Sequence, residues 1–275
     1  MELIHTFKNI VIFSGAGVST NSGIPDYRSE NGIFTNSKLK ELMFSRNYIN
    51  EHPEILESPE YLQFIDSFKQ AQPTDAHKLA KYLHDRGTLC RVYTQNVDGL
   101  YQKAGLPEDK IVEFHGSIQK NIVYYGDPIP NKALEQVKKD LINNVEFIDC
   151  IIVMGSSLQV APFCALPNMV NKHCFRILVD IKPELCYRNE WTDIPEVQGM
   201  YSSPGQVSYT KIGNRKVSLK SFWKSRGKWK NQFVYKMDCD KFSNQVMMGE
   251  EKYMGEAELF SHSDLSDESS DLDLT

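Results

Sequence analysis

The segment that most constrains this chain is a glycine-rich turn at residues 15–29, which read GAGVSTNSGIPDYRS. It directly follows the apolar run NIVIFS, so it stands where a buried strand would lead into a helix. Gly15 and Gly17 would let the backbone approach a pyrophosphate closely, and the helix start would offer unpaired N–H groups to the anion. Arg28 could add a bidentate phosphate contact. Tight turns also need glycine for steric reasons, and the spacing is not the standard dinucleotide fingerprint, so this turn alone leaves both readings open.

Composition places the chain among globular proteins. Its 275 residues are 41% hydrophobic, enough for one large domain or for a domain with a small inserted module. The net charge of −5 argues against a generally basic nucleic-acid binder. Neither a leader-like N-terminus nor an apolar run of membrane-spanning length occurs, so we expect no membrane contact and an intracellular location, cytoplasmic or nuclear.

The six cysteines, at positions 90, 150, 164, 174, 186 and 239, include no Cys-x-x-Cys pair. Several lie in apolar contexts, which favours buried free thiols. A zinc ribbon would need close cysteine pairs, so we expect no structural zinc and no other metal site.

Short apolar runs alternate with stretches of helical periodicity, which indicates an α/β fold with a mainly parallel, Rossmann-like sheet. The expected strands cover residues 10–13, 89–93, 148–154, 176–179 and 232–235. Helices are expected over residues 59–69, capped by Ser58, and from Thr74 to about Gly87. Residues 31–72 therefore form a small helical insertion between the first two strands, within a catalytic domain of residues 1–248.

Two later segments differ in composition. Residues 211–236 hold nine Lys or Arg and no acid, interleaved with aromatic side chains, so residues 199–236 are expected to form a basic loop or hairpin insertion. This stretch could contact an acidic partner or nucleic acid, although a solvated hairpin is the simpler reading. The acidic, serine-rich tail at residues 249–275 is expected to be disordered.

Polar clusters follow the expected strands: SGAG after Phe13, TQNVD after Tyr93, HG after Phe114, GSSLQ after Met154, and Asp180. Ligands of an open α/β sheet bind at the carboxyl ends of its strands, so the clusters should converge on one crevice. Taken singly, each has a structural reading as a helix cap, a core histidine or a helix entry. An ordinary dehydrogenase would place a ribose-binding acid about 20 residues beyond the glycine turn. A helical stretch lies there instead, which leaves hydride transfer a minor hypothesis.

Taken together, these motifs resemble those of one protein family. GAGVSTNSGIPDYRS, TQNVDGL, the pair His115 and Gly116, GSSLQVAPF and a late Cys239 occur in the order expected of sirtuins, the NAD-dependent protein lysine deacylases. The resemblance covers about residues 9–240, and several multi-residue motifs in register are hard to obtain by chance.

The resemblance implies roles for these residues. His115 would be the general base on a ribose hydroxyl, supported by Asn96 and Asp98, because histidine titrates near neutral pH. The residues implied to hold NAD are Gly15, Ala16, Gly17, Asp26, Tyr27, Arg28, Gln95, Asn96, Val97, Asp98, Gly155, Ser156, Ser157, Asp180 and Cys239. The acyl-lysine peptide would add as a strand to Tyr125, Gly126 and Asp127 and to Leu158 and Val160.

The chain departs from the family pattern in one large respect. Most sirtuins carry two cysteine pairs for zinc after the His-Gly pair, whereas here IVYYGD follows within a few residues, so the resemblance implies that the ribbon is deleted. This leaves three functions open: a deacylase acting on acetyl or longer apolar acyl groups, an NAD glycohydrolase or mono-ADP-ribosyltransferase, and an ADP-ribose-binding scaffold without enzymatic activity.

Overall fold

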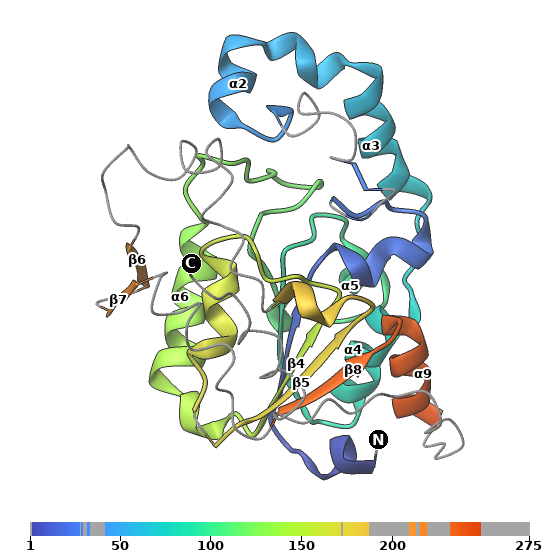
Figure 1. Cartoon of the computed structure of the whole chain (residues 1–275), viewed down its shortest axis with the longest axis vertical. Coiled ribbons are helices and arrows are strands. Elements are labelled where there is room, and N and C mark those ends of the chain that lie inside the picture. The colour runs from blue at the N-terminus through green and yellow to red at the C-terminus, as the bar shows by residue number, and fades with distance from the viewer. Residues whose placement is uncertain are drawn as a thin grey trace, which may run out of the picture.

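A six-stranded parallel sheet forms the centre of the molecule in the computed structural model (Figure 1). The structure describes residues 2–27, 29, 32–33, 42–171, 173–186, 209–212, 215–218 and 232–248. The strand order is β3-β2-β1-β4-β5-β8. The strands are β1 (Ile10–Ser14), β2 (Leu89–Thr94), β3 (Ile111–Glu113), β4 (Cys150–Met154), β5 (Phe175–Asp180) and β8 (Gln232–Lys236). The order reverses between β1 and β4, which makes their carboxyl ends the topological switch point of the sheet.

Helices cover both faces of this sheet (Figure 1). The α-helices are α2 (Arg46–Glu51), α3 (Pro59–Gln70), α4 (Asp75–Asp85), α5 (Leu100–Lys103), α6 (Asn131–Val137) and α9 (Cys239–Met248). Shorter helical turns are η1 (Glu2–Thr6), η2 (Ala16–Ser22), η3 (Pro53–Glu57), η4 (Glu108–Lys110), η5 (Lys138–Asn143), η6 (Val145–Phe147), η7 (Phe163–Asn168) and η8 (Pro183–Cys186). Within the described ranges, every helix is too short or too polar to serve as a membrane span.

Residue alternation along β1 shows why the sheet is buried on both sides. Val11 and Phe13 belong to one core, which α6 closes, whereas Ile10 and Ile12 belong to the other, which α4 and α9 close. Successive side chains of a strand point to opposite faces, so an unbroken apolar run is what a strand covered on both faces requires. The expected Rossmann-like parallel architecture is thus confirmed.

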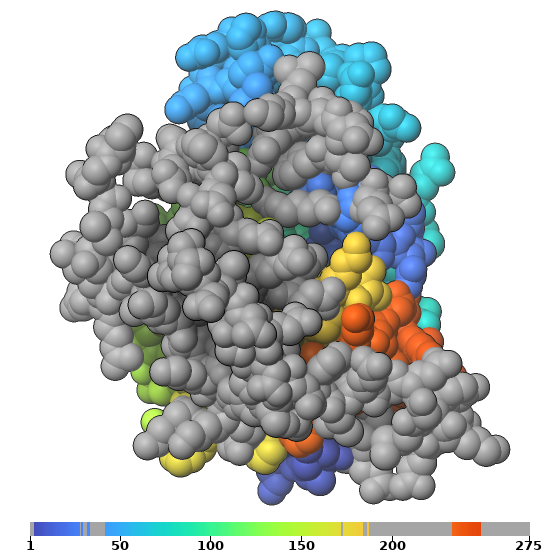
Figure 2. Space-filling model, in the orientation of Figure 1, coloured from blue at the N-terminus to red at the C-terminus, as the bar shows by residue number. Residues whose placement is uncertain are grey.

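The expected helical insertion is present between β1 and β2, where α2, η3 and α3 lie at the end of the molecule opposite the N-terminal η1 (Figure 2). Helix α3 begins at Pro59, and the Ser58 side chain accepts the N–H of Tyr61. This is the capping arrangement expected from the sequence. Buried Phe44, Phe64 and Phe68 give the insertion its own small core.

Several boundaries differ from expectation. Strand β4 starts at Cys150, two residues later than expected. The Asp149 carboxylate just before it accepts the N–H groups of Lys8 and Asn9, at 2.9 and 3.0 Å. The three-residue β3 was absent from the expected apolar runs, because so short and half-buried a strand gives little sequence signal.

Part of the expected basic insertion is seen. Strands β6 (Tyr209–Ile212) and β7 (Arg215–Ser218) pair antiparallel as a hairpin, whereas the end of the basic stretch is β8, a strand of the main sheet. The rest of that stretch and the tail at residues 249–275 lie outside the described residues.

Candidate functional site

The two turns at the switch point pack backbone against backbone. The N–H groups of Gly15 and Gly17 donate to the carbonyl oxygens of Met154 and Gly155, at 3.2 and 2.8 Å. A Cβ atom on Gly17 would lie 2.7 Å from the Gly155 Cα, closer than such atoms approach in proteins. Gly155 has a φ of 58°, which also favours glycine. The glycines are therefore needed to bring the ends of β1 and β4 together.

This geometry corrects one expectation about the turn. The N–H groups of Gly15 and Gly17 are already used within the protein and are not free to bind an anion. The element that follows is the short 3₁₀ turn η2, not an α-helix. The space beside the two glycines is filled by Gly155 and Ser156, and Arg28 lies outside the described residues.

His115 lies at the end of β3 with its ring orientation fixed. Its Nδ1 is 3.2 Å from the carbonyl oxygen of Gln95, the first residue after β2. A carbonyl only accepts hydrogen bonds, so the proton of the neutral ring lies on Nδ1 and the lone pair on Nε2. Desolvation lowers the pKa of His115 to about 4, so the imidazole is neutral at pH 7. His115 thus presents an unprotonated Nε2, as a general base must.

Gln95 links three strand ends through both its backbone and its side chain. Its Oε1 accepts the hydroxyl proton of Ser156, which follows β4, at 2.7 Å. The Ser156 Oγ in turn accepts the N–H of Leu158 at 3.2 Å. His115, Gln95 and Ser156 therefore meet as expected at one edge of the sheet, while neighbouring Ser157 is half-buried.

A second polar cluster lies in the chain after β2. The Ser19 hydroxyl donates to Asp98 Oδ2 at 2.7 Å and accepts from Asn96 Nδ2 at 3.0 Å. Asp98 Oδ1 accepts the N–H of Leu100 at 3.0 Å, so Asp98 also caps α5. All three side chains of the cluster are buried. The expected role of Asp98 at the start of α5 is therefore seen, while its role in binding a ligand stays a prediction.

Ser19 was not among the residues expected at the site. It lies within the GAGVST motif, but its side chain is directed away from the glycine cradle to the cluster formed by Asn96 and Asp98. The only sequence signal for it was its place in that motif. Nothing in the local sequence indicates a contact across 79 residues of chain.

Val97 belongs to the core of the insertion and is buried there. Its carbonyl oxygen accepts the N–H of Ile118 at 2.9 Å. Tyr27 also packs into this core, with ring centroids 5.6 Å from Phe44 and 6.3 Å from Phe64. Asp26 Oδ1 accepts the N–H of Ser29 at 2.8 Å, which shapes the loop beyond the glycine turn. The roles of these residues in binding a cofactor stay predictions.

Beyond β4, this edge of the sheet continues with the end of β5 and the start of α9. Asp180 ends β5 and accepts the N–H of Lys182 at 2.8 Å. Cys239 is buried as the first residue of α9, with its Sγ 3.8 Å from the Val179 carbonyl oxygen. Burial raises the pKa of the Cys239 thiol well above its usual range, so the thiol stays protonated. A carboxylate and an apolar wall thus lie side by side.

The residues expected to bind a peptide are partly used by the fold. The Tyr125 N–H donates to the Phe44 carbonyl oxygen at 2.7 Å, and the Tyr125 carbonyl accepts from Arg46 at 2.9 Å. Both backbone groups of Tyr125 are therefore paired with the insertion. Leu158 is buried with a φ of 52°, and the Val160 carbonyl accepts the N–H of Cys164.

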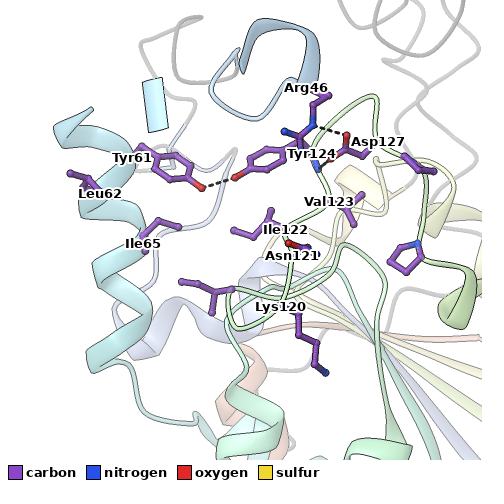
Figure 3. A pocket seen from close by; sticks show the side chains of 13 residues that line it. Arg46, Tyr61, Leu62, Ile65, Lys120, Asn121, Ile122, Val123, Tyr124 and Asp127 are labelled. Carbon is purple, nitrogen blue, oxygen red and sulfur yellow. Dashed lines mark hydrogen bonds and ion pairs between the residues drawn. The ribbon is translucent and has the colours of Figure 1, made fainter. Parts of the chain in front are cut away.

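A groove lies between α3 and the segment at residues 118–130 (Figure 3). It encloses about 630 Å³. Tyr61 of α3 and Tyr124 of the facing segment join the two walls, with their hydroxyl groups 2.6 Å apart. The Arg46 guanidinium lies over the Tyr124 ring while it pairs with Asp127. Apolar Leu62 and Ile65 lie on the α3 wall with Tyr61. The groove is a surface on which a peptide could lie.

The segment after His115 turns back within a few residues. Gly116 and Ile122 form an antiparallel bridge, and the Ser117 N–H donates to the Asn121 carbonyl oxygen at 3.2 Å. Five of the six free cysteines are buried and Cys90 is half-buried. Within the ranges that the structure describes, no group of three or more His, Cys, Asp or Glu side chains could hold a metal ion. The absence of zinc stays a prediction.

A doubly wound parallel sheet with polar side chains gathered at its switch point defines a nucleotide-binding type of α/β protein. A Sir2 family model matches residues 15–121. An NAD-dependent protein deacetylase, HST2 of Candida albicans, is 32% identical over 231 residues, covering 69% of this chain and 68% of that protein. The chain belongs to the Sir2 family, the sirtuins.

Two further comparisons agree with this assignment. The NAD-dependent deacetylase sir2D of Dictyostelium discoideum is 31% identical over 229 residues, covering 65% of this chain but only 40% of that protein. A solved Sir2 complex with a deacetylated p53 peptide and 3′-O-acetyl-ADP-ribose superposes with a TM-score of 0.62 at 24% identity, covering 90% of this chain and 96% of the other. That likeness shows the fold.

Proposed function

We propose that this chain is an NAD-dependent protein lysine deacylase, which transfers the acyl group of a modified lysine to ADP-ribose and releases nicotinamide. The observation that carries the proposal is the orientation and protonation of the His115 ring. Its Nδ1–H is held by the Gln95 carbonyl, and its Nε2 is free to take a proton at the edge of the sheet where the glycine cradle lies. The relatives' names as NAD-dependent deacetylases support the same reaction.

The residues at this edge fit NAD. The closely packed backbone of Gly15, Gly17 and Gly155 lies at the switch point of the sheet, where the pyrophosphate is proposed to bind. Asp180 supplies a carboxylate for ribose hydroxyl groups, and the buried Cys239 adds an apolar surface suited to a base. NAD supplies an activated ribosyl carbon from which nicotinamide can leave.

The chain's own residues would then orient and move protons. His115 Nε2 would remove the proton of a ribose hydroxyl, and its Nδ1–H to the Gln95 carbonyl would hold the ring during that transfer. Asp98, fixed by Ser19 and Leu100, would face the carboxamide of nicotinamide. The apolar residues of the insertion would exclude water from the crevice.

The acyl-lysine substrate would approach from the side of the insertion. Gly126, Asp127 and Val160 are proposed to contact the peptide, together with the groove beside α3. Because both backbone groups of Tyr125 are already paired, strand addition would have to use its neighbours. We propose acetyl or longer apolar acyl groups as substrates. Sirtuins that favour acidic acyl groups place a tyrosine and an arginine close together after the glycine-rich loop, and the NGIFTNSKLKEL segment lacks that pair.

The test is incubation of the full chain with NAD and an acetyl-lysine peptide, with mass-spectrometric detection of nicotinamide and deacetylated peptide. The expected result is equimolar formation of both products in wild type and their loss in His115→Ala. His84→Ala, on the last turn of α4, serves as the matched control and should keep full turnover. NAD turnover that persists in His115→Ala would contradict the assignment of the base.

An NAD glycohydrolase is the second candidate. The observation that favours it is the pairing of Tyr125 with Phe44 and Arg46, which removes one edge that an extended peptide would use. Nicotinamide release that is independent of peptide, with the peptide left acetylated, would establish this alternative over the deacylase.

A further inference from the structure

A histidine of α4 lies behind the cluster formed by Asn96 and Asp98. His77 is fully buried, and its ring meets Tyr101 edge to face with centroids 4.6 Å apart. The residue is too deep to touch a ligand in the crevice. Its contacts lead nevertheless from helix α4 to Asp98.

Contacts at the start of α4 hold the orientation of this ring. The Thr74 hydroxyl donates to the Val18 carbonyl oxygen at 2.7 Å, and the Thr74 N–H is 3.2 Å from His77 Nδ1. The Thr74 hydroxyl oxygen is also 2.9 Å from Nδ1, so backbone and side chain of Thr74 both contact this edge of the ring. Burial lowers the pKa of His77 to about 4, so the ring is neutral at physiological pH.

His77 Nε2 lies 3.5 Å from the Ser19 hydroxyl oxygen, a long contact. Ser19 Oγ also accepts from the Asn96 side-chain amide at 3.0 Å. A carboxylate oxygen only accepts, so the one proton of the Ser19 hydroxyl goes to Asp98 Oδ2, at 2.7 Å. His77 is thus a third polar neighbour of the hydroxyl that holds Asp98.

We propose that His77 is a positioning residue for Asp98, acting through the Ser19 hydroxyl. The contact with His77 holds the Ser19 hydroxyl in place, and Ser19 in turn holds the Asp98 carboxylate in one orientation. The kinetic part of this inference rests on the proposed deacylase function. The structural part does not, because the N–H of Leu100 bonds to Asp98 Oδ1 and reports on Asp98 without any ligand.

Two substitutions separate the contacts of His77. In His77→Asn the amide oxygen can take the place of Nδ1 and accept from Thr74, but the side chain is too short to reach Ser19. In His77→Gln the amide nitrogen can reach Ser19. His84→Asn, on the same helix, is the matched control. The measurements are amide exchange at Leu100, urea unfolding, and the kinetics of NAD turnover with an acetyl-lysine peptide.

The expected result for His77→Asn is about tenfold faster exchange at Leu100 and about tenfold lower kcat/KM for NAD, with the KM for peptide unchanged, since one buried hydrogen bond is at stake. His77→Gln should recover most of both losses, and His84→Asn should match wild type. The double variant Ser19→Ala with His77→Asn should lose no more than Ser19→Ala alone, because both act through one hydroxyl.

Three results would each overturn the proposal. The first is an exchange rate at Leu100 in His77→Asn equal to that of wild type. The others are additive losses of kcat/KM in the double variant, and a His77→Gln variant that recovers neither the exchange rate nor kcat/KM. The double-variant comparison keeps the test decisive if His77→Asn lowers overall stability. A wild-type chain without NAD turnover would overturn the proposed deacylase, whereas the exchange at Leu100 would still decide the role of His77.

Discussion

Arg46 and Asp127 form a two-point ion pair, with Nε to Oδ1 at 2.7 Å and Nη2 to Oδ2 at 2.8 Å. Arg46 begins α2 of the insertion, whereas Asp127 lies in the segment after His115. Together with the backbone pairing of Tyr125 to Phe44 and Arg46, the pair joins the two parts of the small module.

Breaking this pair should loosen the insertion. Asp127→Asn is expected to lower the free energy of unfolding by about 1 kcal/mol, because the pair is bidentate while the Arg46 side chain is 36% exposed and screened by solvent. Urea unfolding of Asp127→Asn, Arg46→Gln and the double variant measures the coupling. If the free energy of unfolding falls in the double variant by the sum of the two single-variant decreases, the two residues do not interact.

The same pair should make stability depend on acid. Donation from Arg46 holds the pKa of Asp127 below its usual value. A carboxyl group with a lowered folded pKa stabilises the protein above the unfolded pKa of about 4, and this contribution disappears as pH falls through the folded pKa. The stability difference between wild type and Asp127→Asn should therefore be constant above about pH 5 and shrink below it.

A methyl group on Gly17 should separate the two turns of the switch point. It would lie 2.7 Å from the Gly155 Cα, and overpacking of this kind costs about 1–3 kcal/mol. We expect Gly17→Ala to lower both stability and NAD affinity, as measured by calorimetry. Gly87→Ala is the control: its φ of 73° carries a strain of about 1–2 kcal/mol, but nothing lies within 4 Å of the new atom. NAD affinity should survive there, and equal affinity losses in the two variants would refute the steric reading.

The pH dependence of turnover should reflect the buried state of His115. Desolvation lowers its pKa to about 4, so the base is already unprotonated at pH 6. The acidic limb of kcat/KM for NAD should accordingly lie well below the value of about 6.5 for a free histidine. A limb centred near pH 6.5 would mean that His115 is solvated in the free enzyme.

The start of α3 offers a test of local stability. The Ser58 side chain accepts the N–H of Tyr61 at 3.2 Å. Ser58→Ala should destabilise the insertion by about 1 kcal/mol, whereas Ser58→Asp should keep the cap. Hydrogen exchange in α3 measures the effect, and unchanged protection in Ser58→Ala would show that packing alone holds the helix.

Short sequence patterns were sufficient to predict the features that depend on interactions between residues close in the chain. The cap at Ser58, the first turn at Pro59 and the apolar run of β1 follow from short-range hydrogen bonding and from burial on both faces of a sheet. The motifs after the strands also predicted which residues would meet, because parallel strands deliver their carboxyl ends to one edge.

The sequence by itself determined the parallel sheet, the glycine turn and the gathering of His115, Gln95 and Ser156, since all three follow from strand direction and residue size. Only the tertiary structure showed that the N–H groups of Gly15 and Gly17 donate to the Met154 and Gly155 carbonyl oxygens and that Tyr125 pairs with the insertion. It also decided the contact of His77 with Ser19, across 58 residues. Such contacts join segments distant in the chain, and their partners are selected by packing, which no local pattern records.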